Sequence, residues 1–136
     1  MKLNPHKTDA LLTALLLLDI GLTINAFLFP AHWFQLMHGV TGAVDPEGFL
    51  QRIGGSWAAF ALFQAIALFR WRERPHWLAV VAGLRLSELF ADWVLMAYAR
   101  DLTILGKIGL GLSPPVNVFC AWYLLRAMAD GRRSLR

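Results

Sequence analysis

Three ionisable side chains lie inside one apolar stretch of the sequence. Arg85, Glu88 and Asp92 fall near the middle of residues 83–100, which have the length and hydrophobicity of a membrane-spanning helix. On a helix of about 3.6 residues per turn, Arg85 and Asp92 share a face, and Glu88 lies one turn from each of them. Arg85 can therefore pair with Glu88 or with a carboxylate on a neighbouring helix, whereas Glu88 and Asp92 repel each other.

Each of four apolar stretches carries a strongly polar side chain near its centre. If these stretches cross a bilayer as helices, the polar side chains reach a similar depth and form one layer. We therefore predict a buried polar layer that could also be a ligand-binding site. Its members are Asp19, Gln64, Arg85, Glu88, Asp92 and Asn117.

The carboxyl groups of this layer outnumber its cations. Asp19, Glu88 and Asp92 stand against Arg85 alone, and an unpaired charge at mid-bilayer costs at least ~2.5 kcal/mol. A proton, a cation, a bound ligand or a partner subunit must supply the balance. Three interpretations stay open: a structural layer that fixes helix register, a cavity that binds a polar headgroup, a quinone-like molecule, an ion or a proton, and a docking surface whose charges pair only in an oligomer.

The composition indicates the class of protein that carries this layer. Hydrophobic residues make up 57% of the 136 residues and charged residues 16%, whereas soluble domains have roughly 45–50% and about 25%. The polar outer face that a soluble helix bundle needs is missing. We therefore expect a single integral membrane domain over residues 1–136, all-α and built as a four-helix bundle in a lipid bilayer. Its spans are predicted at about residues 9–29, 53–70, 77–98 and 108–128.

Proline and glycine residues mark the expected ends of the helices. Pro30 ends the first span, and residues 31–39 are typical of a short interfacial helix in the first outer loop, closed by Gly39. The sequence SPP at 113–115 is expected to kink the fourth span or to mark its true start. Small residues predict close helix packing at Gly54, Gly55, Gly106, Gly109 and Gly111.

The basic residues predict the orientation of the spans. Nine Lys and Arg side chains lie in the N-terminal tail, in residues 70–76 and at the C-terminal end, whereas three lie on the opposite side. This asymmetry predicts that both termini are in the cytoplasm. Because the basic residues lie in short segments between apolar stretches and form no stripe, we expect no nucleic-acid partner.

Few other residues suggest a chemical site. His32 and His38 are weak candidates for metal ligands, because their spacing fits no standard ligand pattern. No histidine lies inside a span, so haem within the bundle is not expected. Cys120 is the only cysteine and is expected to pack as a small hydrophobic residue. The chain has no Ser–His–Asp spacing, phosphate-binding glycine loop or HExxH motif, which favours a non-catalytic role.

Three segments of the chain resemble the small four-helix DoxX-like membrane proteins of bacteria. They are GLTINAFLFPAHWFQLMHG, RIGGSWAAFALFQAIAL and LRLSELFADWVLMAYAR. Their order is a first span ending in proline, an outer loop, an arginine before a Gly-Gly second span, and a charged third span. The resemblance implies a four-helix bundle in the bacterial cytoplasmic membrane and, for some members, association with membrane redox or quinone-linked complexes. It carries over no catalytic residue.

The sequence thus predicts a non-catalytic accessory or ligand-binding subunit of a larger membrane complex. A bound lipid or quinone is the expected ligand, and other membrane subunits or further copies of the chain are the expected partners. The alternative is a small proton- or cation-coupled transporter, in which Glu88 or Asp19 titrates and Arg85 is the counter-ion. A third alternative is an intramembrane enzyme that uses a carboxyl pair on a lipid-like substrate.

Overall fold

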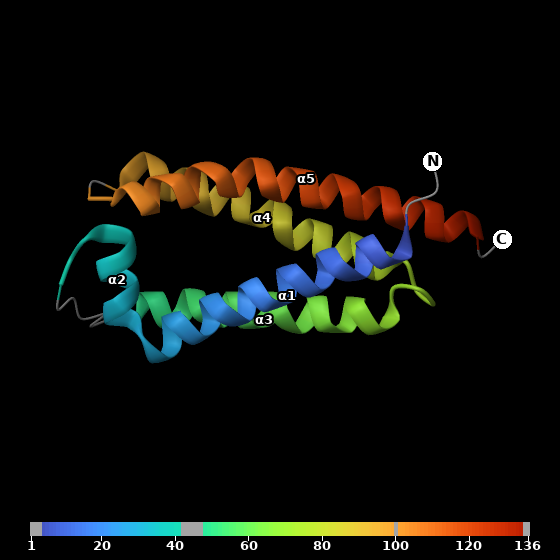
Figure 1. The fold of residues 1–136 in the computed structure, drawn as a ribbon, viewed down its shortest axis with the longest axis horizontal. Helices are drawn as coiled ribbons and strands as arrows, with labels where there is room; N and C mark the ends of the chain where they lie inside the picture. Colours follow the sequence, from blue (N-terminus) through green and yellow to red (C-terminus); the bar gives the residue numbers. More distant parts are fainter. Residues whose placement is uncertain (1–3, 42–47, 100, 135–136) are drawn as a thin grey trace.

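All regular elements in the described part of the chain are α-helices (Figure 1). The computed structural model describes residues 4–41, 48–99 and 101–134. The expected all-α fold is confirmed. The helices are α1 (Pro5–Leu28), α2 (Pro30–His38), α3 (Phe49–Arg70), α4 (His76–Tyr98) and α5 (Ile104–Ser134).

Proline and capping residues set the boundaries of the first two helices. Asn4 caps α1, because its side chain accepts a hydrogen bond of 2.9 Å from the His6 N–H, and Pro5 occupies the first helical position. Pro30 opens α2 directly after α1. Gly39 closes α2 with φ 67°, a left-handed conformation that glycine adopts without steric cost. The short helix predicted after Pro30 is therefore present.

Three of the helices could cross a membrane. α1, α3 and α5 are long and apolar enough to do so by length and composition. α4 has 23 residues, but its central charges set it apart from the other three. Large apolar side chains are exposed on the outer surface of the long helices, among them Leu17 (63%), Phe69 (80%) and Ile104 (78%), as lipid contact requires. The chain is therefore a helical membrane protein with three candidate spans.

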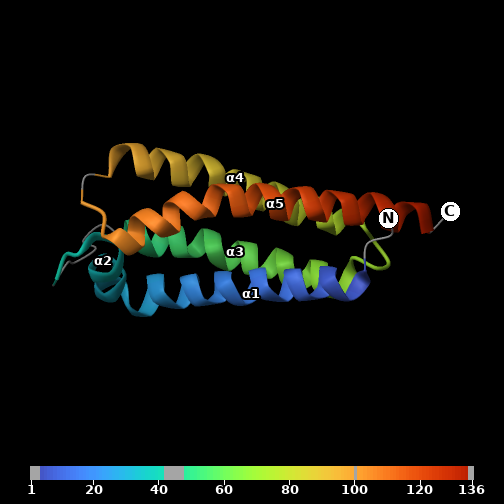
Figure 2. The same cartoon turned by 45° about the horizontal axis from the view of Figure 1, so that its top comes forward.

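The long helices form two antiparallel pairs (Figures 1 and 2). α1 packs along α3, and α4 packs along α5, while the two pairs meet mainly through α3 and α4. The first turn of α1 and the last turn of α5 lie at one end, called the termini end below, and α2 lies at the other, the α2 end (Figure 1).

The two pairs pack most tightly at the termini end. The larger core cluster joins all four long helices there and includes Leu12, Ala67, Leu78 and Leu124. A smaller cluster at the α2 end joins α1 and α3 around Trp57. The last buried residue of α4 is Arg85, and the remaining turns of α4 add nothing to either cluster. Arg85 thus lies where the buried face of α4 ends.

A polar contact fastens α1 to the end of α3. Trp71 donates its indole N–H to Asp9 at 2.8 Å, and Arg72 forms an ion pair with the same carboxylate. The Arg72 side chain is 61% exposed. This pair lies at the termini end and provides a solvent-exposed counterpart to the buried ion pair described below.

The fourth expected span differs from the helix that the structure contains. The chain turns helical at Ile104 and stays helical through Pro114 and Pro115 to Ser134, so SPP does not mark the start of the helix. Figure 2 shows the axis of α5 changing direction along its length. Proline lacks the N–H that would bond to the carbonyl four residues earlier, which explains a bend without a break.

Only some of the glycines serve close packing. A Cβ on Gly54 would lie 2.8 Å from the Ala26 Cβ of α1, and a Cβ on Gly106 would lie 2.5 Å from the Met37 carbonyl oxygen of α2. These two glycines allow helices to approach each other. The prediction of close packing is wrong for Gly55, Gly109 and Gly111, where a Cβ would meet nothing within 4 Å.

Candidate functional site

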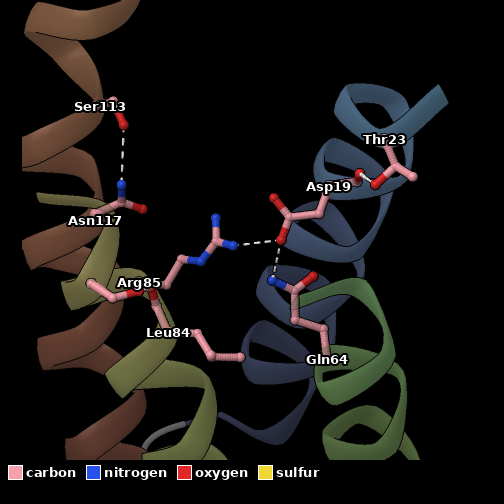
Figure 3. A network of polar contacts seen from close by, with 8 residues as sticks. Asp19, Thr23, Gln64, Leu84, Arg85, Ser113 and Asn117 are labelled. Carbon is pink, nitrogen blue, oxygen red and sulfur yellow. Dashed lines mark hydrogen bonds and ion pairs between the residues drawn. The ribbon is translucent and has the colours of Figure 1, made fainter. Parts of the chain in front are cut away.

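Three of the six predicted polar residues meet between the two helix pairs (Figure 3). The guanidinium of Arg85 on α4 forms an ion pair with Asp19 Oδ2 on α1. Gln64 Nε2 on α3 donates a hydrogen bond of 2.6 Å to the same oxygen. The exposed fractions of Asp19, Gln64 and Arg85 are 1%, 0% and 3%. One carboxylate oxygen therefore joins α4 to both helices of the other pair.

The helical repeat explains why these polar side chains point inward. Each of them continues the buried stripe of its own helix at spacings of three, four or seven residues. Asp19 extends the stripe of α1, Gln64 that of α3 and Arg85 that of α4. The stripes are Thr8, Leu12, Leu15, Asp19 and Ala26; Leu50, Gly54, Trp57, Ala61, Gln64 and Ala67; and Leu78, Val81, Ala82 and Arg85.

The cluster has more hydrogen-bonding capacity than its own members use. Asp19 Oδ1, Gln64 Oε1 and Arg85 Nε are buried and have no partner among the described residues. An unsatisfied buried polar atom costs about 1–3 kcal/mol. Two acceptors and one donor thus remain next to the ion pair. A hydroxyl group or an amide, which can both donate and accept, matches this arrangement.

The Phe60 ring lies next to the Arg85 guanidinium. The Cζ atom of Arg85 is 5.4 Å from the centroid of Phe60 on α3, a cation–π distance. The guanidinium thus contacts both the Phe60 ring and the Asp19 carboxylate. Two such contacts restrict its orientation, as a binding group requires.

Glu88 and Asp92 lie beside the cluster and outside its hydrogen-bond network. The Glu88 carboxylate interacts with the Trp57 side chain of α3, and Asp92 interacts with Ser113 of α5. Two partners were expected for Arg85: Glu88 on its own helix or a carboxylate on a neighbouring helix. The structure has the second, because Arg85 pairs with Asp19 of α1. Arg85 and Glu88 remain within electrostatic range of each other. The two extra carboxylates expected from the sequence therefore lie within electrostatic range of Arg85 but do not pair with it.

Asn117 does not join the cluster. Its side chain is 5% exposed, and Nδ2 donates a hydrogen bond of 3.0 Å to Ser113 Oγ one turn earlier on α5. Ser113 thus links the regions around Asn117 and Asp92, a role that the sequence analysis missed. Ser113 and Asn117 are four residues apart, a spacing that places two side chains on one face of a helix and could have indicated their contact.

His32 and His38, the weak candidates for metal ligands, both lie on α2. His38 Nδ1 lies 3.0 Å from the Asp101 carbonyl oxygen, and His32 is exposed. Within residues 4–41, 48–99 and 101–134, no three His, Cys, Asp or Glu side chains are grouped as metal ligands. Cys120 is 3% exposed and packs in the larger core cluster, as expected for a small hydrophobic residue.

Comparison of the chain with family models, with characterised proteins and with solved structures gives no match. The site must therefore be interpreted from its own chemistry. A fixed guanidinium, a carboxylate with one free oxygen and a free amide oxygen form a compact group of donors and acceptors in apolar surroundings. Such a group can bind and orient a small polar moiety.

Proposed function

We propose that the chain is a four-span membrane protein that binds the polar group of a lipid-soluble molecule at Asp19, Gln64 and Arg85. It would act as a non-catalytic subunit of a larger complex in the bacterial cytoplasmic membrane, in keeping with the resemblance to DoxX-like proteins. The observation that carries the proposal is the buried cluster with three unpartnered polar atoms.

The proposal requires α4 to be the fourth span. With 23 residues at about 1.5 Å per residue, α4 is long enough for a hydrocarbon core of ~30 Å. Its arginine is paired with Asp19, and pairing reduces the cost of placing the charge in a membrane. An even number of spans also suits two termini at one end (Figure 1). The predominance of basic residues at this end favours a cytoplasmic location for it.

The chemistry of the cluster favours a ligand with a hydroxyl or carbonyl group. A hydroxyl can donate to Asp19 Oδ1 or Gln64 Oε1 and accept from Arg85 Nε. Quinols and lipid headgroups carry such hydroxyls, and quinones carry the matching carbonyl acceptor. Quinones, quinols and lipids all partition into bilayers. Such a ligand would reach the cluster laterally between helices.

The ligand proposal predicts a loss of bound ligand when Gln64 is replaced. Purification from native membranes, followed by organic extraction and mass spectrometry, is expected to find a quinone-like or lipid ligand and further membrane subunits. Gln64→Leu should retain about tenfold less ligand, because a lost buried hydrogen bond is worth ~1–2 kcal/mol.

Asn117→Leu is the matched control for this experiment. It makes the same type of change at a buried amide that bonds to Ser113 and lies outside the cluster, so ligand retention should stay unchanged. A monodisperse wild-type monomer without ligand or partner subunit would overturn the proposal. Equal retention by the two variants would remove the cluster as the binding site.

A second candidate function is a proton- or cation-coupled transporter. The observation that favours it is the position of Glu88 and Asp92 within electrostatic range of Arg85, just beyond the last buried residue of α4. Two extra carboxylates there can take up a proton or a cation when the pairs move relative to each other.

The transporter hypothesis predicts that Glu88→Gln abolishes the pH dependence of flux in proteoliposomes. The substitution keeps the shape of the side chain and removes its titration. Glu73→Gln is the control, because Glu73 pairs with Arg70 in the exposed connection between α3 and α4. If Glu88→Gln and Glu73→Gln gave the same flux and the same pH profile, Glu88 would not be the coupling group.

A further inference from the structure

A groove of about 560 Å³ lies between α4 and α5, and its lining includes none of Asp19, Gln64 and Arg85. Leu89 and Trp93 line it from α4, and Gly111, Pro115, Phe119 and Trp122 line it from α5. Its walls are apolar and face outward, since Trp93, Phe119 and Trp122 are 56%, 59% and 51% exposed. In a membrane this groove opens toward the lipid.

Local sequence explains the groove. Gly111 lines the groove, and a Cβ there would meet nothing within 4 Å, so the groove is open at this position. The stretch of α5 from Gly111 to Trp122 is about 16 Å long at ~1.5 Å per residue. This length is about half of a hydrocarbon core of ~30 Å, the depth of one lipid leaflet. An acyl chain therefore matches the groove in polarity and in length.

The positively charged side chain of Arg126 lies at one end of the groove. The Cζ atom of Arg126 lies 5.2 Å from the centroid of the Trp122 ring, one helical turn toward the termini end. No ion pair joins Arg126 to another side chain of the described residues. Arg126 thus continues the groove with a positive charge beyond its last aromatic wall.

The position of Arg126 along α5 suits the membrane surface. A Cβ on Gly131 would lie 3.2 Å from Pro75, which places Gly131 at the level of the connection between α3 and α4. Arg126 is about 7.5 Å from that level along the helix, at ~1.5 Å per residue. Arg126 therefore lies within two helical turns of the headgroup region.

We propose that the groove binds one acyl chain of an anionic phospholipid, whose phosphate pairs with Arg126. Trp122 forms the apolar wall beneath the guanidinium and holds it at the mouth of the groove. The negative charge is needed because guanidinium binds phosphate oxygens through charge-assisted hydrogen bonds. This site shares no residue with the Asp19 cluster, so the two proposals can fail independently.

Native mass spectrometry of the full chain in detergent tests this site. The probes are dioleoyl phosphatidylglycerol and dioleoyl phosphatidylcholine, which differ only in the headgroup. Wild-type protein should bind phosphatidylglycerol about fivefold more tightly, the ratio that corresponds to ~1 kcal/mol per basic residue near anionic lipid. Arg126→Gln should abolish this preference, and Arg126→Lys should retain most of it.

Filling the groove provides a second, separate variant. Gly111→Leu places a side chain in the groove and should weaken the binding of both lipids. The matched controls are Gly109→Leu, where a Cβ also meets nothing within 4 Å but which does not line the groove, and Arg132→Gln on the same helix. Both controls should bind lipid like the wild type.

Several results would overturn the lipid site. One is equal binding of the two lipids by the wild type, and another is equal lipid preference in Arg126→Gln and Arg132→Gln. Equal lipid binding by Gly111→Leu and Gly109→Leu would also contradict it. A wild-type dimer that Gly111→Leu converts to a monomer would show that a second copy of the chain, and not a lipid, occupies the groove.

Discussion

Arg85→Gln is expected to lower the free energy of unfolding by about 3–5 kcal/mol, the usual cost of breaking a buried ion pair. The substitution leaves the Asp19 carboxylate, which is 1% exposed, without its cation. It also removes the contact that joins α4 to α1 at the end of the buried face of α4. The unpaired Asp19 charge and the lost α4–α1 contact both weaken the packing of the α1–α3 pair against the α4–α5 pair.

Unfolding by SDS in mild detergent micelles, followed by helical circular dichroism, measures this loss. Arg72→Gln is the matched control, because Arg72 also pairs with an α1 carboxylate but is 61% exposed. Its loss should stay below about 1 kcal/mol, as for other exposed pairs. If Arg85→Gln cost no more than Arg72→Gln, the buried pair would not hold the helix pairs together.

Gly54→Ala is expected to destabilise the protein by about 1–3 kcal/mol through overpacking. The added Cβ would lie 2.8 Å from the Ala26 Cβ and 3.2 Å from the Phe27 ring. The Ala26 Cβ is fixed to the backbone of α1 and cannot turn away, so α1 and α3 must move apart. The Gln64–Asp19 hydrogen bond of 2.6 Å spans these same two helices and should lengthen.

Gly55→Ala is the control for this prediction, because a Cβ there would meet nothing within 4 Å. The same detergent titration should give it wild-type stability or a small gain, since alanine is the better helix former. Equal effects of the two substitutions would mean that the close approach of α1 and α3 at Gly54 does not limit their packing.

The inward direction of the polar residues could be predicted from sequence, but their partners could not. A helical repeat specifies which residues share a face with the apolar stripe, and Asp19, Gln64 and Arg85 do so. The sequence left two carboxylate partners open for Arg85. The choice of Asp19 depends on how α4 is rotated against α1, which only packing determines. Glu88 is instead turned toward Trp57.

Asn117 shows the limit of predictions from depth alone. Its position in the middle of an apolar stretch placed it in the same layer as Asp19 and Gln64. Its amide bonds to Ser113 on its own helix, a partner that lies one turn away and needs no second helix. Equal depth therefore did not make it part of the connected cluster.

The glycines and prolines show a similar limit. Composition identifies small residues but not which of them face a neighbour, and so Gly54 and Gly106 allow close approach while Gly55 does not. Pro114 and Pro115 lie inside a continuous helix, because the loss of two backbone hydrogen bonds can be tolerated within a long, packed helix. A sequence rule that considers the proline alone takes no account of the stabilisation that a long, packed helix provides.

A double-mutant cycle on Asp19 and Arg85 tests most directly whether this buried pair joins the two halves of the protein. Asp19→Asn, Arg85→Gln and the double variant would be compared with the wild type by detergent titration. We predict that the double variant loses about 2–3 kcal/mol less than the sum of the single losses, because each substitution alone leaves the other charge buried and unpaired. Additive losses would contradict the account.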